Sequence, residues 1–273
     1  MYVHVIDTSW RPNGEGGFLA YDISSDTWTE LPTPGDGNFE ITRYGDTVVA
    51  FRGTDEADPS SDLIYDPAEA AWEPLPDDPL SPSFDRTMID VDGELFLFAK
   101  DLVANPGSEQ PSLVRAAVLD PESMTWTIRA DSEILSSENA TAVGDEVIFA
   151  TSGSADGGQV NNWGRSYSNG GIYDTRADSW APLPEPAASD GFRIAGLFGD
   201  GTSTAYAAAG NVLLRNDMRW AETPFPAFSE NSLFNQAVAA TDDSLFVFGG
   251  EQWAPGQAEA TLSNDAQIWT PTP

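Results

Sequence analysis

Short apolar runs separated by tight polar turns recur along the whole chain. Gly and Asp in such turns tolerate a positive φ, so the pattern predicts β-hairpins. The run after each turn is continuously apolar, which indicates a strand buried on both faces. The clearest examples are Gly45-Asp46 before Val48–Phe51, Asp92–Glu94 before Leu95–Phe98, Gly144–Glu146 before Val147–Ala150, and Asp242–Ser244 before Leu245–Phe248.

A second pattern follows the hairpins: a Tyr or Leu, an Asp, five residues, a Trp and often a Leu-Pro pair. We name the strands of one repeat a and b (the hairpin), c (ending in Asp) and d (beginning near Trp). The Asp can accept backbone hydrogen bonds as an Asx turn between c and d. The Trp anchors an edge strand inside the structure, and the Pro removes a ladder donor from that edge. The copies are Tyr21-Asp22 to Trp28, Tyr65-Asp66 to Trp72, Leu119-Asp120 to Trp126 and Tyr173-Asp174 to Trp180, with weaker ones at Leu214-Arg215 to Trp220 and Ala266 to Pro271.

This combination of hairpin, Tyr-Asp, Trp and Leu-Pro resembles the kelch repeat. Phe248-Gly249-Gly250 also carries the family's diglycine, which other copies replace by pairs such as Arg52-Gly53. The resemblance implies an all-β propeller of kelch type, with about six four-stranded antiparallel blades in one domain. The expected blades span residues 1–34, 35–79, 80–131, 132–186, 187–226 and 227–273.

The first and last predicted blades are each one strand short. Residues 1–34 supply b, c and d, whereas residues 235–273 supply a, b and c. A propeller normally completes one blade with strands from both termini. We therefore interpret the chain as a fragment of a longer protein; the alternative is that these two blades are simply incomplete.

The formal net charge of −32 disfavours two classes of partner. A surface with this much negative charge repels the phosphates of nucleic acids and of anionic lipids. The charge admits two explanations: a cationic partner, or adaptation to salt in a halophilic source, which we favour. No apolar window is long enough for a membrane span.

Cysteine is absent, which excludes disulfides, thiolate metal sites and cysteine nucleophiles. Residues 1–7 show no signal peptide. A secreted or cell-surface location is expected only if the native start lies upstream. The composition gives no reason to expect more than a monomer.

Loops of variable length indicate where a site lies. The a–b and c–d turns are short, whereas the b–c loops vary widely and share one face of the predicted propeller with the d–a connections. Binding residues concentrate on such loops, and aromatic, Arg and Asn side chains suit sugars or peptide carboxylates. The candidate binding residues are Trp10, Arg11, Arg52, Arg86, Lys100, Asn162, Trp163, Arg165, Tyr167, Arg193 and Trp253.

The sequence contains few candidate catalytic residues. The single histidine, His4, leaves no Ser–His–Asp triad and no histidine metal centre. Asp55, Asp58 and Asp62, or Asp36, offer calcium ligands, but their spacing matches no known loop and favours solvated turns. We therefore expect no catalytic residues, metal or cofactor.

Three functions stay open from the sequence. A non-catalytic module that binds a glycan or a protein is favoured. The resemblance also implies sugar-acid isomerases or epimerases that use Arg and carboxylates, although the copper oxidases of this family need cysteine and histidine that are lacking here. The third is a purely structural propeller within a multidomain protein.

Overall fold

The computed structural model divides the chain into two compact units. Unit 1 comprises Met1–Leu102 and Arg115–Asp131, and unit 2 comprises Val103–Val114 and Ser132–Pro273. The structure describes residues 2–5, 17–22, 24–35, 39–55, 61–103, 111–135, 140–149, 167–168, 170–183, 197–199, 204–208, 211–214, 219–222, 233–234, 237–240, 245–248, 251–252, 261–263 and 266–269. Side chains are described for those between 17 and 183 and for residues 261–263, 266 and 268.

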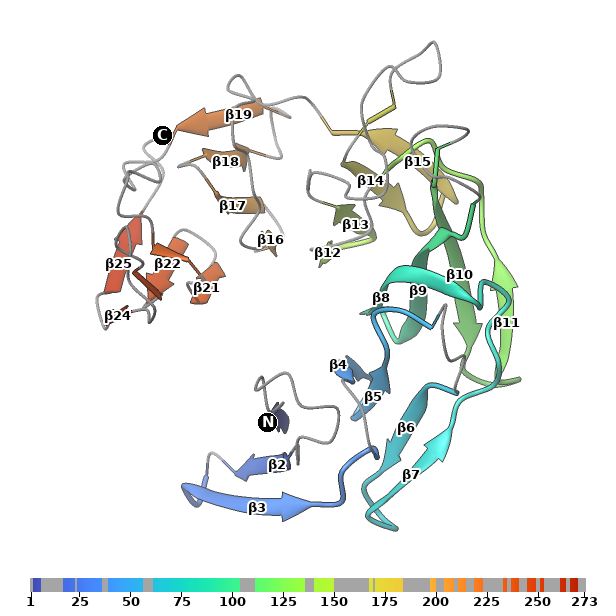
Figure 1. The fold of residues 1–273 in the computed structure, drawn as a ribbon, viewed down its shortest axis with the longest axis vertical. Coiled ribbons are helices and arrows are strands. Elements are labelled where there is room, and N and C mark those ends of the chain that lie inside the picture. The colour runs from blue at the N-terminus through green and yellow to red at the C-terminus, as the bar shows by residue number, and fades with distance from the viewer. Residues whose placement is uncertain are drawn as a thin grey trace. The chain divides into compact units, whose positions relative to one another are not determined.

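Unit 1 contains three antiparallel sheets, one of three strands and two of four. Figure 1 shows their strands in blue to green. The three-stranded sheet is β1 (Tyr2–Val5), β2 (Gly17–Asp22) and β3 (Thr27–Leu31). The first four-stranded sheet is β4 (Glu40–Tyr44), β5 (Thr47–Phe51), β6 (Leu63–Asp66) and β7 (Ala71–Pro74). The second is β8 (Ser83–Val91), β9 (Glu94–Asp101), β10 (Val114–Asp120) and β11 (Thr125–Ile128).

Unit 2 repeats this arrangement. Its four-stranded sheets are β12 (Ala140–Val143), β13 (Glu146–Phe149), β14 (Gly171–Asp174) and β15 (Ser179–Pro182), then β16 (Leu197–Gly199), β17 (Thr204–Ala208), β18 (Asn211–Leu214) and β19 (Arg219–Glu222). A three-stranded sheet follows: β21 (Ala237–Ala240), β22 (Leu245–Phe248) and β25 (Ala266–Trp269). Another, unexpected from the sequence, joins β20 (Leu233–Phe234), β23 (Glu251–Gln252) and β24 (Thr261–Leu262).

These sheets confirm the all-β prediction and its four-strand unit. Every described element is a strand or a turn, and the strands of each four-stranded sheet follow one another in sequence order. Among the described residues, the first sheet and the sheet β21–β22–β25 have three strands each, and the predicted number of blades stays a prediction. In the same residues, no helix has the length and apolarity to cross a membrane.

The c–d hairpins form as the Tyr-Asp and Trp pattern predicts. Tyr65 faces Trp72 across β6 and β7, and the same pairing joins the equivalent residues in three other sheets. Across β18 and β19, Trp220 instead faces Leu213, one residue before the predicted partner Leu214. The Asp that ends strand c accepts backbone hydrogen bonds from the following turn; for example, Asp66 Oδ1 accepts from Ala68 N at 2.8 Å. The hairpin is thus fixed by contacts within a few residues.

The last residue of each described c–d turn between β2 and β15 has a positive φ. Asp26 and Asp178 occupy this position in two repeats, at φ 53° and 51°, and each accepts a hydrogen bond from the tyrosine hydroxyl of its own repeat. Ala70 and Met124 adopt nearly the same φ, 49° and 51°. A left-handed backbone is unfavourable for a residue with a Cβ, and Asp or Asn tolerates it better than Ala.

We expect Ala70→Gly to stabilise the protein. The left-handed φ of Ala70 is strained, and glycine adopts it freely, although glycine also gains freedom in the unfolded chain. The free energy of unfolding should rise by about 0.5–1 kcal/mol. Urea unfolding of the variant measures this, with Ala68→Gly in the same turn as the control, which should not be stabilised.

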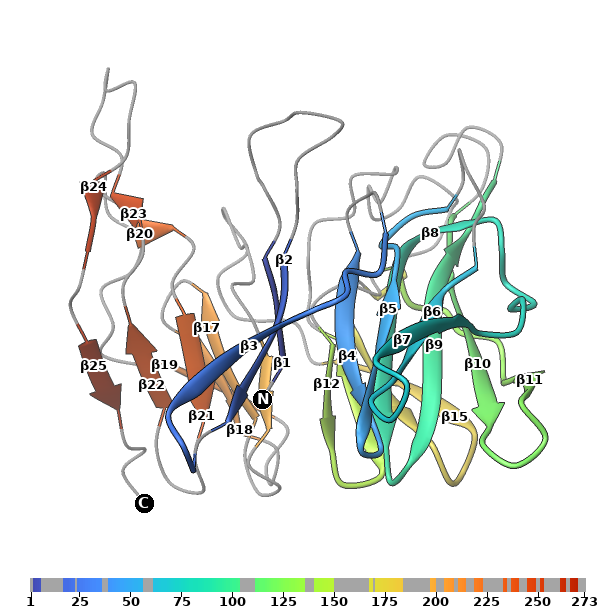
Figure 2. The same ribbon diagram turned by 90° about the horizontal axis from the view of Figure 1, so that it is seen from below.

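The sheets of unit 1 pack through apolar cores. The β4–β7 and β8–β11 sheets share a buried cluster that includes Val49, Leu95 and Leu97, each fully buried. Phe18 of β2 is likewise fully buried against Tyr65 and Trp72. In Figure 2 the hairpin turns β4–β5 and β8–β9 lie at the same end of their sheets, where Gly45 N donates to Asp90 Oδ2 at 2.6 Å.

The repeat tryptophans are more exposed than the interior anchors that the sequence predicts. Trp72 and Trp126 are half-buried, and each donates its indole N–H to a proline carbonyl at the end of the preceding sheet. Trp28 is 54% exposed. The reason is positional: no described residue covers the outer side of Trp28, whereas a preceding Leu-Pro segment covers the other two.

Candidate binding site

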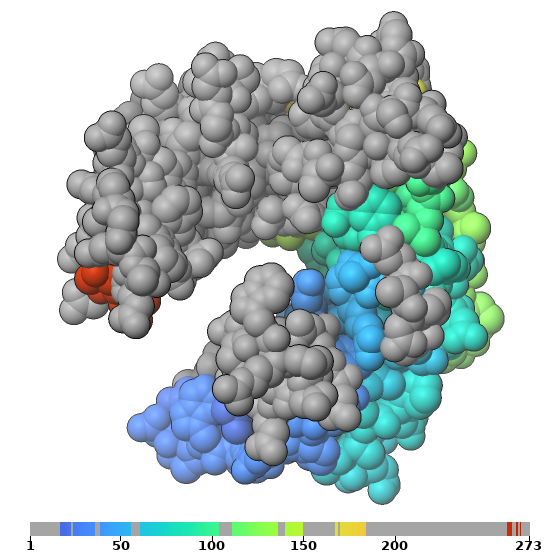
Figure 3. All heavy atoms as spheres, viewed as in Figure 1, coloured from blue at the N-terminus to red at the C-terminus, as the bar shows by residue number. Residues whose placement is uncertain are grey.

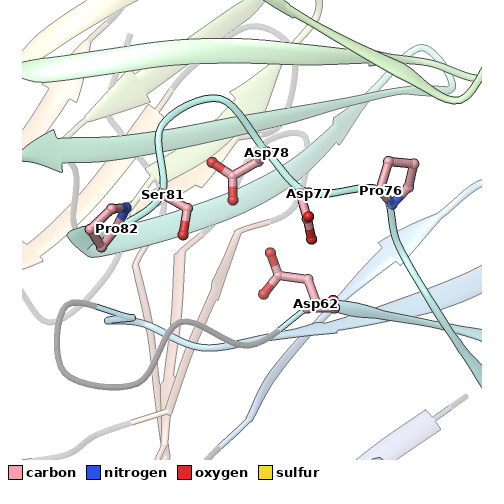
Figure 4. Close-up of a pocket in the computed structure, with 7 residues that line it drawn as sticks. Asp62, Pro76, Asp77, Asp78, Ser81 and Pro82 are labelled. Atoms are coloured by element: carbon pink, nitrogen blue, oxygen red, sulfur yellow. The ribbon is translucent and has the colours of Figure 1, made fainter.

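A cavity of about 330 Å³ opens on unit 1 where a b–c loop meets a d–a connection. Ser61 and Asp62, which precede β6, form one wall. The other wall comes from residues 76–82 between β7 and β8, and Figure 4 shows its acidic side chains facing Asp62. The sequence predicts the binding face at these two kinds of connection. The lining residues are Ser61, Asp62, Pro76, Asp77, Asp78, Ser81 and Pro82.

Arg86 of β8 lies behind this cavity and holds its carboxylates in place. Arg86 Nη2 contacts Asp62 Oδ2 at 2.8 Å and Asp78 Oδ2 at 2.9 Å. Arg86 Nη1 donates to Asp62 Oδ1 at 3.3 Å and lies 3.8 Å from Asp55 Oδ2. The side chain of Arg86 is 1% exposed. A single buried guanidinium therefore binds carboxylates from the b–c loop and from the d–a connection.

Further hydrogen bonds join the two connections. Asp55 Oδ1 and Oδ2 accept from Ser83 N and from the Ser81 hydroxyl. The backbone adds two links, from Asp55 N to Ser83 O at 3.0 Å and from Arg86 N to Gly53 O at 2.7 Å. The cavity walls are thus fixed to the scaffold before any ligand arrives, which lowers the entropic cost of binding.

Burial raises the pKa of two carboxyl groups in this cluster. The pKa of Asp62 is raised above its ordinary value of 3.8, because desolvation disfavours the charged form more than Arg86 favours it. The pKa of Asp78 is raised for the same reason. Burial alone would lower the pKa of Arg86, but the charges of the carboxylates outweigh burial and raise it. One guanidinium does not neutralise three carboxylates, so the cluster favours an extra proton.

The raised pKa values predict how stability depends on pH. The folded protein holds more protons at Asp62 and Asp78 than the unfolded chain does. This contribution is therefore complete below about pH 4 and is lost as pH rises through the folded-state pKa values. Asp78→Asn should reduce the slope of unfolding free energy against pH between about pH 4 and pH 7.

Asp77→Asn is the matched control for this experiment. Asp77 is the exposed neighbour of Asp78, so its removal relieves general charge repulsion by the same amount. Urea titrations of the two variants and the wild type at several pH values measure the slopes. Equal slopes for the two variants would contradict the assigned role of Asp78.

Three predicted binding residues lie near this end of unit 1, and the structure brings two of them together. Arg86 Nη1 donates to the backbone oxygen of Arg52 at 3.3 Å, and the Arg52 guanidinium lies 5.2 Å from the centre of the Phe39 ring. Lys100 is buried, 3.4 Å from Asp85 Oδ2 and 4.9 Å from the centre of the Phe84 ring. These side chains support the connections, and their binding role stays a prediction.

Of the other predicted residues, the structure describes Tyr167 alone. Tyr167 is half-buried and belongs to unit 2. The remaining seven lie outside the described residues: Trp10, Arg11, Asn162, Trp163, Arg165, Arg193 and Trp253.

Asp77, Asp78 and Ser81 are the lining residues that sequence reasoning missed. The available signal was the acidic pair directly after Leu75-Pro76, in a d–a connection, but acidic residues are too abundant here for one pair to stand out. The expectation that Asp55 and Asp62 are solvated was wrong: they are 2% and 7% exposed. Within the described ranges, no group of acidic or histidine side chains is arranged to hold a metal ion.

No protein-family model matches the chain, and no curated protein matches it either.

Proposed function

We propose that this chain is a non-catalytic binding module, a kelch-type propeller that recognises a glycan or a protein partner through the face of its b–c loops and d–a connections. The cavity beside Arg86 carries this proposal. It lies at one such pair of connections, and three aspartates and two serines line it. These groups accept hydrogen bonds, so they suit a ligand rich in donors, such as sugar hydroxyls or a basic side chain.

The charge of the cavity favours binding over the sugar-acid isomerase alternative. A sugar acid would bring its own carboxylate against Asp62, Asp77 and Asp78, where like charges repel. The arginine beside the cavity is buried, and both of its Nη atoms already contact carboxylates of the protein. Hydroxyl or ammonium donors meet no such repulsion.

A glycan array and a peptide array test the proposal. Each is probed with the purified protein at about 0.1 M and about 1 M salt, because salt weakens exposed charge interactions. A defined ligand class should bind, and Asp77→Asn should weaken it about tenfold through the loss of one charge-assisted hydrogen bond.

Glu69→Gln provides the control. It removes the same charge from an exposed c–d turn at the other end of the same sheet, so it should leave affinity unchanged. The proposal fails if neither array gives a ligand. It fails equally if a ligand binds wild type and Asp77→Asn with the same affinity.

A further inference from the structure

Two tryptophans of unit 1 bind the end of the preceding sheet in the same way. Trp72 Nε1 donates to Pro32 O at 2.8 Å, and Trp126 Nε1 donates to Pro76 O at 2.9 Å. Each proline is the second residue of a Leu-Pro pair, Leu31-Pro32 or Leu75-Pro76. At both places the indole N–H of a repeat tryptophan thus binds the carbonyl of a proline that follows the preceding sheet.

Trp28 occupies the equivalent position in the first sheet. Tyr21 faces Trp28 across β2 and β3, with ring centres 4.7 Å apart, much as Tyr65 faces Trp72 at 5.2 Å. The side of unit 1 formed by residues 17–35 is visible in blue in Figure 3. Trp28 is 54% exposed, and among the described residues no acceptor binds its indole N–H. Within the described residues of unit 1, the equivalent surface is therefore formed and has no segment bound to it.

The charge around Trp28 indicates the kind of segment that fits. Asp22, Asp26 and Glu30 are exposed on β2, β3 and their turn, and residues 17–35 contain no Lys or Arg. Basic residues beside the proline would complement these carboxylates. The chain's own Leu-Pro segments are acidic, so a second copy, also at −32, would be repelled.

We propose that the Tyr21–Trp28 pair binds, in trans, a proline-containing extended segment of another protein with basic residues beside the proline. The proline stacks on the Trp28 ring, and the indole N–H donates to the carbonyl of the segment. Extended proline segments suit such a surface because their conformation is fixed before binding. This surface is separate from the acidic cavity, so the two binding proposals fail independently.

The test is a titration of the isotope-labelled full chain with the peptide Arg-Pro-Leu-Pro-Arg, followed by NMR. The indole N–H signal that Trp28→Phe removes identifies Trp28, and this signal should shift on binding. Trp28→Phe keeps an aromatic ring but loses the indole N–H donor, so the affinity for the peptide should fall about three- to tenfold. Trp28→Ala should abolish binding, and it should fold, because a substitution at an exposed site changes stability little.

Matched controls separate this surface from general apolar or charge effects. Ile128→Ala alters another exposed apolar side chain, 48% exposed on β11, and should leave affinity unchanged. The peptides Arg-Ala-Leu-Ala-Arg and Glu-Pro-Leu-Pro-Asp should bind more weakly, since they lack the prolines and the positive charges respectively. The proposal is overturned if the Trp28 signal does not move at about 5 mM peptide, or if Trp28→Ala binds as wild type does.

Discussion

Arg86→Met should lower the free energy of unfolding by about 3–5 kcal/mol. Methionine occupies a similar length but leaves Asp62 and Asp78 without their cationic partner, in positions that are each 6% exposed. The loss of a buried partner is costly because the remaining charges cannot regain water. The measurement is a urea titration, in which the midpoint should fall.

Two further measurements make the Arg86 result specific. Arg43→Met is the control, because Arg43 is exposed and its Nε donates only to Gly45 O, at 2.9 Å. It should change stability by no more than about 0.5–1 kcal/mol. Lowering the pH should recover part of the loss in Arg86→Met, since protonation removes the unpaired charges. Equal effects of the two substitutions would show that the cluster does not depend on Arg86.

Phe18→Ala should have a comparable effect, about 3–5 kcal/mol, through packing rather than charge. Phe18 is fully buried, and its ring lies 5.3 Å from that of Tyr65 and 5.1 Å from that of Trp72. Its truncation leaves a cavity where β2 packs against β6 and β7. Urea unfolding followed by tryptophan fluorescence measures the loss.

Ile128→Ala again serves as the comparison, since an exposed side chain should contribute within about 0.5 kcal/mol. Phe18→Leu should lie between the two, because leucine fills part of the space. A loss below about 1 kcal/mol in Phe18→Ala would mean that the first sheet is not held by this contact.

The c–d hairpins were predictable because their determinants are local. Asp66 fixes its turn through residues two and three positions away, and Tyr65 meets Trp72 across the hairpin that this turn creates. A fixed spacing in the sequence is then enough to place both partners. The a–b turns were predictable for the same reason, since Gly45 and Gly93 adopt the positive φ that such turns require.

The inter-sheet contacts and the acidic cavity were not predictable in this way. Trp72 binds a carbonyl 40 residues earlier, and Trp126 binds one 50 residues earlier. Arg86 finds its carboxylate partners in two different connections, and nothing distinguishes Asp62 and Asp78 among 44 acidic residues. The sheet β20–β23–β24 has strands of only two residues, too short to show a period.

Lys100 is the chain's one lysine, and its side chain is 0% exposed. Amine-directed reagents, and enzymes that acylate or conjugate lysine, therefore find no ε-amino group on the folded protein. Trypsin cleavage at this residue would require β9 to leave its sheet. Among the described side chains, the exposed positive charges, such as that of Arg43, are guanidinium groups, which stay protonated and offer no nucleophile for such chemistry.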